Sequence, residues 1–179
     1  MKIGLTGGIA CGKSLLSHFL NELGIETLDA DDVVHEIIPD PAERRRLAAE
    51  VFADAAKRAA LEARLHPLVK ARIDEWLGRP PGTDPRVARI AVVPLLFEAR
   101  WEGNFDIICC VASSRANQLA RMMSSRGYTR EEAQARLAAQ MPVEEKAAKS
   151  HYVIRNDGSP EELKESAGRF VEWLKEHQR

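Results

Sequence analysis

The chain has 179 residues, 45% of them hydrophobic and 30% charged, with three cysteines and a net charge of −1. These values are typical of one soluble domain with a sizeable core, and they offer no basic field for nucleic acid, no disulfide framework and no run of the roughly 20 apolar residues that cross a membrane. Because Met1 leads directly into a predicted strand, we expect no signal peptide and a cytoplasmic protein.

The first predicted element carries the clearest functional pattern. Residues 2–6 predict a buried strand, residues 7–14 fit the spacing G-x-x-x-x-G-K-[ST], and apolar residues then recur at helical spacing. The glycines let successive N–H groups point at one anion, and the start of the helix adds its positive end. A chance glycine turn before a helix is the alternative. The predicted phosphate-binding residues are Gly7, Gly8, Ile9, Ala10, Cys11, Gly12, Lys13, Ser14 and Leu15.

Acidic residues follow the second predicted strand, residues 25–28. Asp29, Asp31 and Asp32 fall at its carboxyl end, where open α/β sheets bind ligands. Asp32 alone would cap the helix that follows. Three like charges close together usually need a cation or a proton, so we favour a functional role for Asp29 or Asp31.

A helical region and a third strand come next. Residues 42–70 predict helix with an interruption near residues 53–54, and Pro67 predicts the end of that helix and the start of another over residues 68–77. Residues 78–85 predict a loop before a strand over residues 89–93. Pro94 to Glu98 then predict either a substrate wall or ordinary core packing.

The last third of the chain predicts an arginine-rich helical hairpin between two strands. A strand over residues 105–111 precedes a helix over residues 114–126, a second helix opened by a capping box at Thr129, and a short helical piece over residues 143–149. This hairpin fits a phosphate-clamping lid, although solvated helix faces also carry arginines. A strand over residues 151–155 and a closing helix complete a doubly wound, parallel α/β sheet.

Several segments together resemble one known family. They are LTGGIACGKS from Leu5, DAD at Asp29–Asp31, LHPLV at Leu65–Val69, VPLLFE at Val93–Glu98, QLAR at Gln118–Arg121, ARLAAQ at Ala135–Gln140 and VIRNDGS at Val153–Ser159. With these segments the chain resembles, almost end to end, the dephospho-CoA kinase family, relatives of nucleoside monophosphate kinases.

The resemblance implies a P-loop NTPase-type fold of three layers around a five-stranded parallel sheet. It further implies a single P-loop kinase domain over residues 1–179, with a helical acceptor-binding insert at 32–86 and a lid at 114–150. Such an enzyme uses ATP and Mg²⁺ to phosphorylate the ribose 3′-hydroxyl of dephospho-CoA, giving coenzyme A. Its expected partners are these two small substrates, with no nucleic acid and no membrane, and it is expected to be a monomer or small homo-oligomer.

The resemblance also assigns roles to particular residues. Asp31 becomes the candidate base or orienter of the acceptor hydroxyl, while Lys13 and Arg121 steady the transferring phosphoryl group. Asn156 lies near the adenine of ATP, and Mg²⁺ meets the Ser14 hydroxyl and, through water, Asp31. The implied acceptor-binding residues are Asp29, His66, Pro94, Leu95, Glu98 and Arg136.

Two departures from the family pattern affect the acceptor and the lid. The segment between Ile38 and Glu43 is shorter than the family's by about two dozen residues, a loss that a surface excursion tolerates. Ser125 stands where a lid arginine is often found, next to Arg126. The alternatives are another small-molecule or nucleotide P-loop kinase, or a non-catalytic nucleotide-binding switch, although no N/T-K-x-D or D-x-x-G sequence supports a GTPase.

Overall fold

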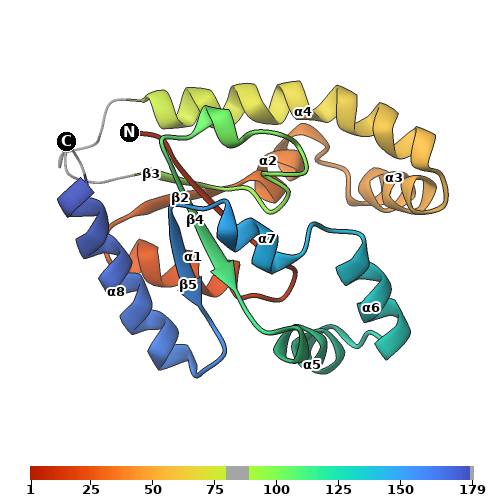
Figure 1. Cartoon of the computed structure of the whole chain (residues 1–179). Coiled ribbons are helices and arrows are strands. Elements are labelled where there is room, and N and C mark those ends of the chain that lie inside the picture. Colours follow the sequence, from red (N-terminus) through yellow and green to blue (C-terminus); the bar gives the residue numbers. More distant parts are fainter. Residues whose placement is uncertain (80–88, 178–179) are drawn as a thin grey trace. The chain divides into compact units, whose positions relative to one another are not determined.

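The structure is a computed structural model that describes residues 1–79 and 89–177 (Figure 1). The chain forms two compact units, which are described separately. Unit 1 comprises Met1–Thr27 and Pro81–Arg179, and unit 2 comprises Leu28–Pro80. The predicted loop at residues 78–85, and the predicted end of the insert at residue 86, lie mostly or wholly outside the described residues.

A five-stranded sheet organises the fold, in the order β2-β3-β1-β4-β5. Its strands are β1 (Ile3–Gly7), β2 (Glu26–Asp29), β3 (Arg89–Val92), β4 (Ile107–Ala112) and β5 (Tyr152–Arg155). β1 pairs in parallel with both β3 and β4, and β4 pairs in parallel with β5. Because the chain leaves β1 for strands on either side of it, the carboxyl end of β1 is the switch point where such sheets bind ligands. The predicted doubly wound parallel sheet is confirmed.

Helices cover both faces of the unit 1 part of this sheet. They are α1 (Lys13–Glu22), α5 (Arg115–Arg126), α6 (Arg130–Ala138), α7 (Val143–Ala148) and α8 (Pro160–His177), with a 3₁₀ turn, η1 (Glu102–Asn104). Alternate strand residues such as Leu5 and Cys109 join the apolar faces of α1 and α8 in one core cluster, while Cys110 and Ala112 pack against Ala147 of α7. The strand alternation therefore divides the core into the predicted three layers. No helix within the described residues has the length and apolarity needed to cross a membrane.

The predicted helix boundaries of unit 1 are confirmed by their caps. Thr129 forms a complete capping box with Glu132, and Ser159 makes the same reciprocal pair of bonds with Glu162. Gly127 ends α5 in the left-handed conformation at φ 66°.

Unit 2 is helical beyond the end of β2. It contains α2 (Ala30–Ile37), α3 (Pro41–Ala53) and α4 (Ala55–Gly78), so the predicted break near residues 53–54 is confirmed. The prediction that Pro67 separates two helices is wrong, because α4 continues through it. Proline removes one backbone hydrogen bond, but Leu65, Val69 and Ile73 are buried at four-residue spacing on both sides of it, and this shared apolar stripe favours one helix.

The residue that caps α2 also differs from the expectation. Asp32 was the predicted cap, but α2 begins three residues earlier than that prediction implies, and Asp29 occupies the N-cap position. Its Oδ1 accepts a hydrogen bond from the N–H of Asp31 at 2.9 Å. Asp29 thus satisfies one of the N–H groups that a helix start leaves without a partner, and Asp31 and Asp32 lie exposed in the first turn.

Candidate functional site

The glycine loop joins the carboxyl end of β1 to the start of α1. Gly12 has φ 94° and lies against the Asn156 side chain, so a Cβ at this position would collide with that amide. Gly7 has the same restriction against the carbonyl oxygen of Val111. Ala10 also adopts a positive φ, 59°, which costs a non-glycine residue about 1 kcal/mol or more. Backbone strain of this kind is concentrated at functional sites.

Every carbonyl group of the loop from Gly7 to Cys11 accepts a hydrogen bond from a side chain of unit 1. Lys13 Nζ donates to the oxygens of Gly7 at 3.1 Å and Gly8 at 2.8 Å. The remaining three donors are Gln118 Nε2 to Ile9 O at 2.8 Å, Arg121 Nη1 to Ala10 O at 3.4 Å, and Asn156 Nδ2 to Cys11 O at 2.9 Å. The carbonyls are thereby engaged, and the first N–H groups of α1, which lack partners within the helix, are the groups suited to an anion.

Two glutamines from the predicted lid hold Ile9 from both sides. Gln118 on α5 donates to its carbonyl oxygen, and the Oε1 atom of Gln140, just after α6, accepts from its N–H at 3.1 Å. Neither glutamine has a local sequence pattern that predicts this role, and their one signal is that they belong to the QLAR and ARLAAQ segments.

Arg121 joins the loop to the ends of β4 and β5. Its guanidinium donates to Ser113 Oγ at 3.0 Å and to the Asn156 carbonyl oxygen at 2.9 Å, in addition to Ala10. Ser113 Oγ in turn donates to the same Asn156 oxygen at 2.6 Å. The structure therefore brings together Lys13, Arg121 and Asn156, three of the predicted site residues, around one loop.

Cys11 faces the interior of this loop and is fully buried. Burial raises the pKa of its thiol, and the nearby Lys13 charge opposes only part of that shift. The thiol therefore stays protonated at neutral pH and lacks the thiolate character of a reactive cysteine. The Cys11 side chain therefore contributes to core packing rather than to cysteine chemistry.

The segment after β3, from Pro94 to Glu98, has both buried and exposed side chains. Leu96 and Phe97 are buried, whereas the neighbouring Leu95 is 40% exposed. The Pro94 carbonyl oxygen accepts from Thr6 Oγ1, in the residue before the glycine loop, at 3.2 Å. Leu96 and Phe97 therefore show the predicted core packing, whereas the alternative of a substrate wall, for which Leu95 is exposed, stays a prediction.

The other predicted acceptor residues are distributed over the lid and unit 2. On α6 the Arg136 guanidinium lies 4.4 Å from the centre of the Tyr128 ring and is otherwise exposed. In unit 2, Asp29 and Asp31 adjoin at the start of α2, and His66 is half-buried on α4.

The donor set suits a magnesium ion that is held partly by a substrate. No group of three or more His, Cys, Asp or Glu side chains that could hold a metal occurs within the described part of the chain. Mg²⁺ needs no such group, since it usually keeps several waters and binds one or two protein oxygens together with phosphate oxygens. Ser14, exposed in the first turn of α1, has a hydroxyl oxygen of the required kind.

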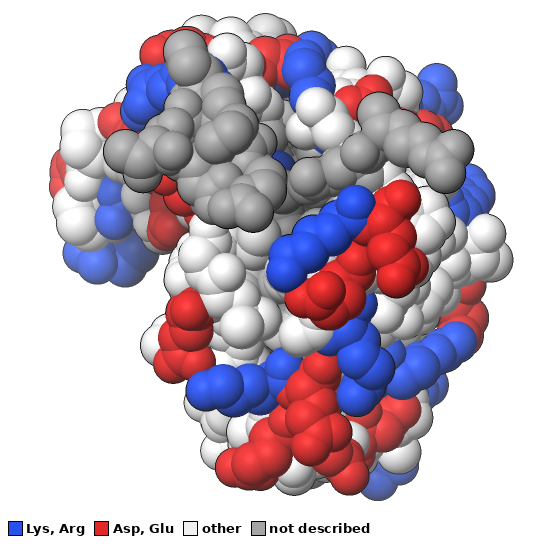
Figure 2. Space-filling view, turned by 90° about the vertical axis from the view of Figure 1, so that its left-hand side faces the viewer, with Lys and Arg blue, Asp and Glu red and all other residues white. Residues whose placement is uncertain are grey.

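Charges of both signs are interspersed on the face shown in Figure 2. The ion pairs formed by lysines of α8 include Lys175–Glu172 within α8 and Lys164–Glu22, which joins α8 to α1, with N to O distances of 2.7 and 2.8 Å. Mixed charge of this kind is unlike the basic stripe of a nucleic-acid-binding face.

Comparison with known proteins adds a consistent result. A family model described as dephospho-CoA kinase matches residues 1–43 and 39–162. A relative named dephospho-CoA kinase, from Geobacter sulfurreducens, is 38% identical over 182 residues, which cover 90% of this chain and 92% of that protein. Among solved structures, TT1252 from Thermus thermophilus is 34% identical with a TM-score of 0.79, covering 97% of both chains. A dephospho-CoA kinase from Campylobacter jejuni is 25% identical with a TM-score of 0.73, covering all of both chains.

The alignments also indicate residues that this chain lacks. The Geobacter alignment spans 182 positions yet covers 90% of a 179-residue chain, so that relative has residues without counterparts here. The match to the family model is divided into two parts, which overlap at residues 39–43. This is the segment in which the sequence predicts a shortening.

Proposed function

This chain belongs to the dephospho-CoA kinase family, and we propose that its glycine loop binds the ATP that phosphorylates dephospho-CoA in coenzyme A biosynthesis. The carrying observation is the glycine loop, in which each carbonyl from Gly7 to Cys11 is bonded to a side chain of unit 1. A loop whose carbonyls are already engaged can present N–H groups to phosphate without reorganising, and preorganised donors are the main source of catalysis in phosphoryl transfer.

On the ATP side, Lys13 neutralises charge on the β- and γ-phosphates as the phosphoryl group moves. It lies within the loop, so it can exchange a carbonyl partner for a phosphate oxygen by a small side-chain movement. Arg121 approaches the loop from α5 and contributes a second positive charge, and Asn156, which is bonded to Cys11, borders the nucleotide on the β5 side. The Ser14 hydroxyl would hold Mg²⁺, which when bound would supply positive charge against the phosphates.

On the acceptor side, Asp31 is assigned to the hydroxyl group that is phosphorylated. One carboxylate oxygen of Asp29 caps α2 by accepting from the N–H of Asp31, whereas the Asp31 side chain lies exposed. An exposed carboxylate can accept the proton of a hydroxyl, or hold that hydroxyl in line with the phosphoryl group. The 3′-hydroxyl of the ribose is the proposed nucleophile, and Asp29, His66, Pro94, Leu95, Glu98 and Arg136 are the proposed acceptor contacts.

The cellular setting belongs to the same proposal. All three cysteines are free thiols, as expected in a reducing compartment, and we place the enzyme in the cytoplasm as a monomer or small homo-oligomer.

One observation favours a second candidate, a P-loop kinase with a different small acceptor. The family match is divided at residues 39–43, within the helical unit, which is the part assigned to the acceptor. A smaller helical unit could suit a smaller acceptor.

The test measures ADP formation with ATP and Mg²⁺ in the presence and absence of dephospho-CoA, with the product identified by mass spectrometry. The proposal predicts ADP and coenzyme A in equal amounts and almost no ADP without the acceptor. The proposal would be refuted if ADP formed at the same rate with and without dephospho-CoA, or if no product formed at all.

A further inference from the structure

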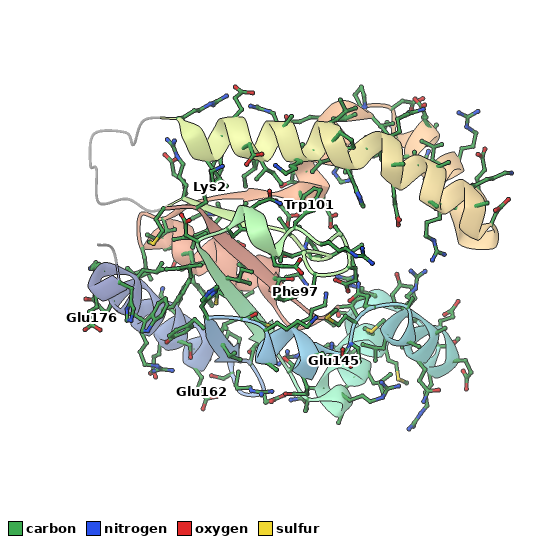
Figure 3. The ribbon with its side chains drawn as sticks, turned by 45° about the horizontal axis from the view of Figure 1, so that its top comes forward. Lys2, Phe97, Trp101, Glu145, Glu162 and Glu176 are labelled. Carbon is green, nitrogen blue, oxygen red and sulfur yellow. The ribbon has the colours of Figure 1, made fainter. Side chains whose placement is uncertain are left out.

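Lys146, a buried lysine that forms an ion pair with the proposed acceptor contact Glu98, has no role in the mechanism given above. Among the described residues, Lys146 on α7 is the one charged residue in the fully buried set, with 0% of its side chain exposed. Figure 3 labels its neighbour Glu145 and also Phe97, the neighbour of its partner Glu98. Burying an ammonium group costs free energy unless an ion pair and hydrogen bonds compensate the lost hydration. The groups that contact Lys146 therefore indicate what its charge does.

The Lys146 ammonium makes two short contacts, both to the segment that follows β3. Nζ donates to the Pro94 carbonyl oxygen at 2.7 Å and lies 2.8 Å from Glu98 Oε1. Pro94 and Glu98 are both proposed acceptor contacts. The single charge of Lys146 therefore contacts both ends of the segment from Pro94 to Glu98.

Glu98 is held through only one of its two oxygens. Oε1 forms the ion pair with Lys146 and accepts a hydrogen bond from the N–H of Met141 at 3.0 Å, just beyond α6. No described residue bonds to Oε2, and 24% of the Glu98 side chain is exposed. An ionised carboxylate can only accept hydrogen bonds, so Oε2 suits a hydroxyl, amide or amino donor and disfavours a phosphate.

From these contacts we propose that Lys146 is a positioning residue, which holds Glu98 so that Oε2 faces a hydrogen-bond donor of the acceptor. This rests on the proposed function, because it takes Glu98 as an acceptor contact. Met141 and Lys146 both belong to the predicted lid at residues 114–150, so this part of the chain contacts the proposed acceptor wall through one carboxylate oxygen of Glu98. A displaced Glu98 would therefore weaken acceptor binding more than ATP binding, since none of the glycine-loop bonds involves it.

Steady-state kinetics on two variants test this inference. Lys146→Met removes the charge at similar length, and Lys146→Arg keeps the charge but cannot fit a wider guanidinium between the same two oxygens. We expect both variants to raise the KM for dephospho-CoA by about tenfold, the effect of one lost charged hydrogen bond, with the KM for ATP changed less than twofold. Lys175→Met, on the exposed side of α8, is the control and should match the unmodified protein.

Thermal unfolding and a Glu98→Gln variant separate the possible outcomes. If the lysine only compensates buried charge, Lys146→Met and Lys146→Arg will have a lower Tm and an unchanged acceptor KM, and the inference is overturned. If the methionine variant does not fold, the arginine variant decides in the same way. An unchanged acceptor KM in Glu98→Gln would instead refute the proposed acceptor role of Glu98. A raised KM in that variant, with unchanged values in both Lys146 variants, would leave that role standing and refute only the positioning role.

Discussion

At the scale of single residues, Lys13 is the charge on which the proposed chemistry depends most. We predict that Lys13→Ala lowers turnover by on the order of 100-fold or more, the effect of losing one preorganised electrostatic donor. Circular dichroism should show a folded protein, because Lys13 is only partly buried and lies outside the apolar core. Lys175→Ala is the surface control. Near-normal turnover of Lys13→Ala with ATP and Mg²⁺ would exclude its proposed role.

The second residue-scale prediction separates the roles of Asp31 and Asp29. Asp31→Asn should retain binding of both substrates by calorimetry and lose about 100-fold or more in turnover, the usual size of a general-base or positioning effect. Asp29→Asn keeps the α2 cap, because asparagine caps as well as aspartate, so it should act mainly on the acceptor KM or the Mg²⁺ requirement.

Asp32→Asn is the matched control, since it removes the same charge from the exposed first turn of the same helix. If Asp29→Asn abolishes turnover while Asp31→Asn behaves normally, the two roles are reversed. If neither changes turnover, the acidic segment is only the start of a helix.

The residues that could be predicted were those with a local signature. Gly7, Gly12 and Lys13 have fixed spacing in one loop, and the loop has the strand–turn–helix context that this spacing implies. Gln140 and Lys146 could not be assigned, because their partners Ile9 and Pro94 are distant in sequence. The α2 cap was assigned to the wrong aspartate because three neighbouring carboxylates fit the same local rule, and only the backbone start of the helix distinguishes them.

At the scale of elements, Arg121 connects the predicted lid to the glycine loop by a hydrogen bond to the Ala10 carbonyl oxygen. We expect Arg121→Lys to lower turnover more than it weakens ATP binding, because a lysine ammonium cannot span Ala10, Ser113 and Asn156 as the planar guanidinium does. Turnover and calorimetric ATP affinity are measured together, with Arg115→Lys, an exposed residue of the same helix, as control. Equal losses in both quantities would mean that Arg121 acts only in the ground state.

Helix and strand boundaries followed from the sequence where caps or apolar periodicity marked them. The capping boxes at Thr129 and Ser159 are local, and the alternating strand residues need only the period of two. The exception is α4, where Pro67 is a local break signal that the buried stripe on either side outweighs. At Pro67, therefore, tertiary burial outweighs the local rule that predicts a helix break.

At the scale of the whole molecule, the buried thiols predict how stability depends on pH. Burial raises the pKa of Cys110 from its ordinary value of 9.0 to about 12 and raises the pKa of Cys109 as well. In the unfolded chain these thiols ionise near the ordinary value. Their contribution to stability is therefore constant below pH 9 and is lost as the pH rises above it.

The measurement is the free energy of unfolding by denaturant from pH 7 to 11. Between pH 9 and 11, removing the thiol in Cys110→Ala should make the decline shallower by about 1.4 kcal/mol per pH unit, the value for one titrating group. The variant will also be less stable at every pH because it leaves a cavity. Parallel curves for the two proteins would contradict the prediction.

The central claim, that this chain phosphorylates dephospho-CoA although the sequence predicts a shortened helical insert, is tested most directly by acceptor specificity. The measurement is kcat/KM at saturating ATP and Mg²⁺ for dephospho-CoA, AMP and adenosine, which share the ribose hydroxyl and differ in the remainder of the molecule. We predict a preference for dephospho-CoA on the order of 100-fold or more, as expected when a site contacts the distinguishing groups of its substrate. An equal or higher value for either smaller acceptor would contradict the account and favour the alternative kinase.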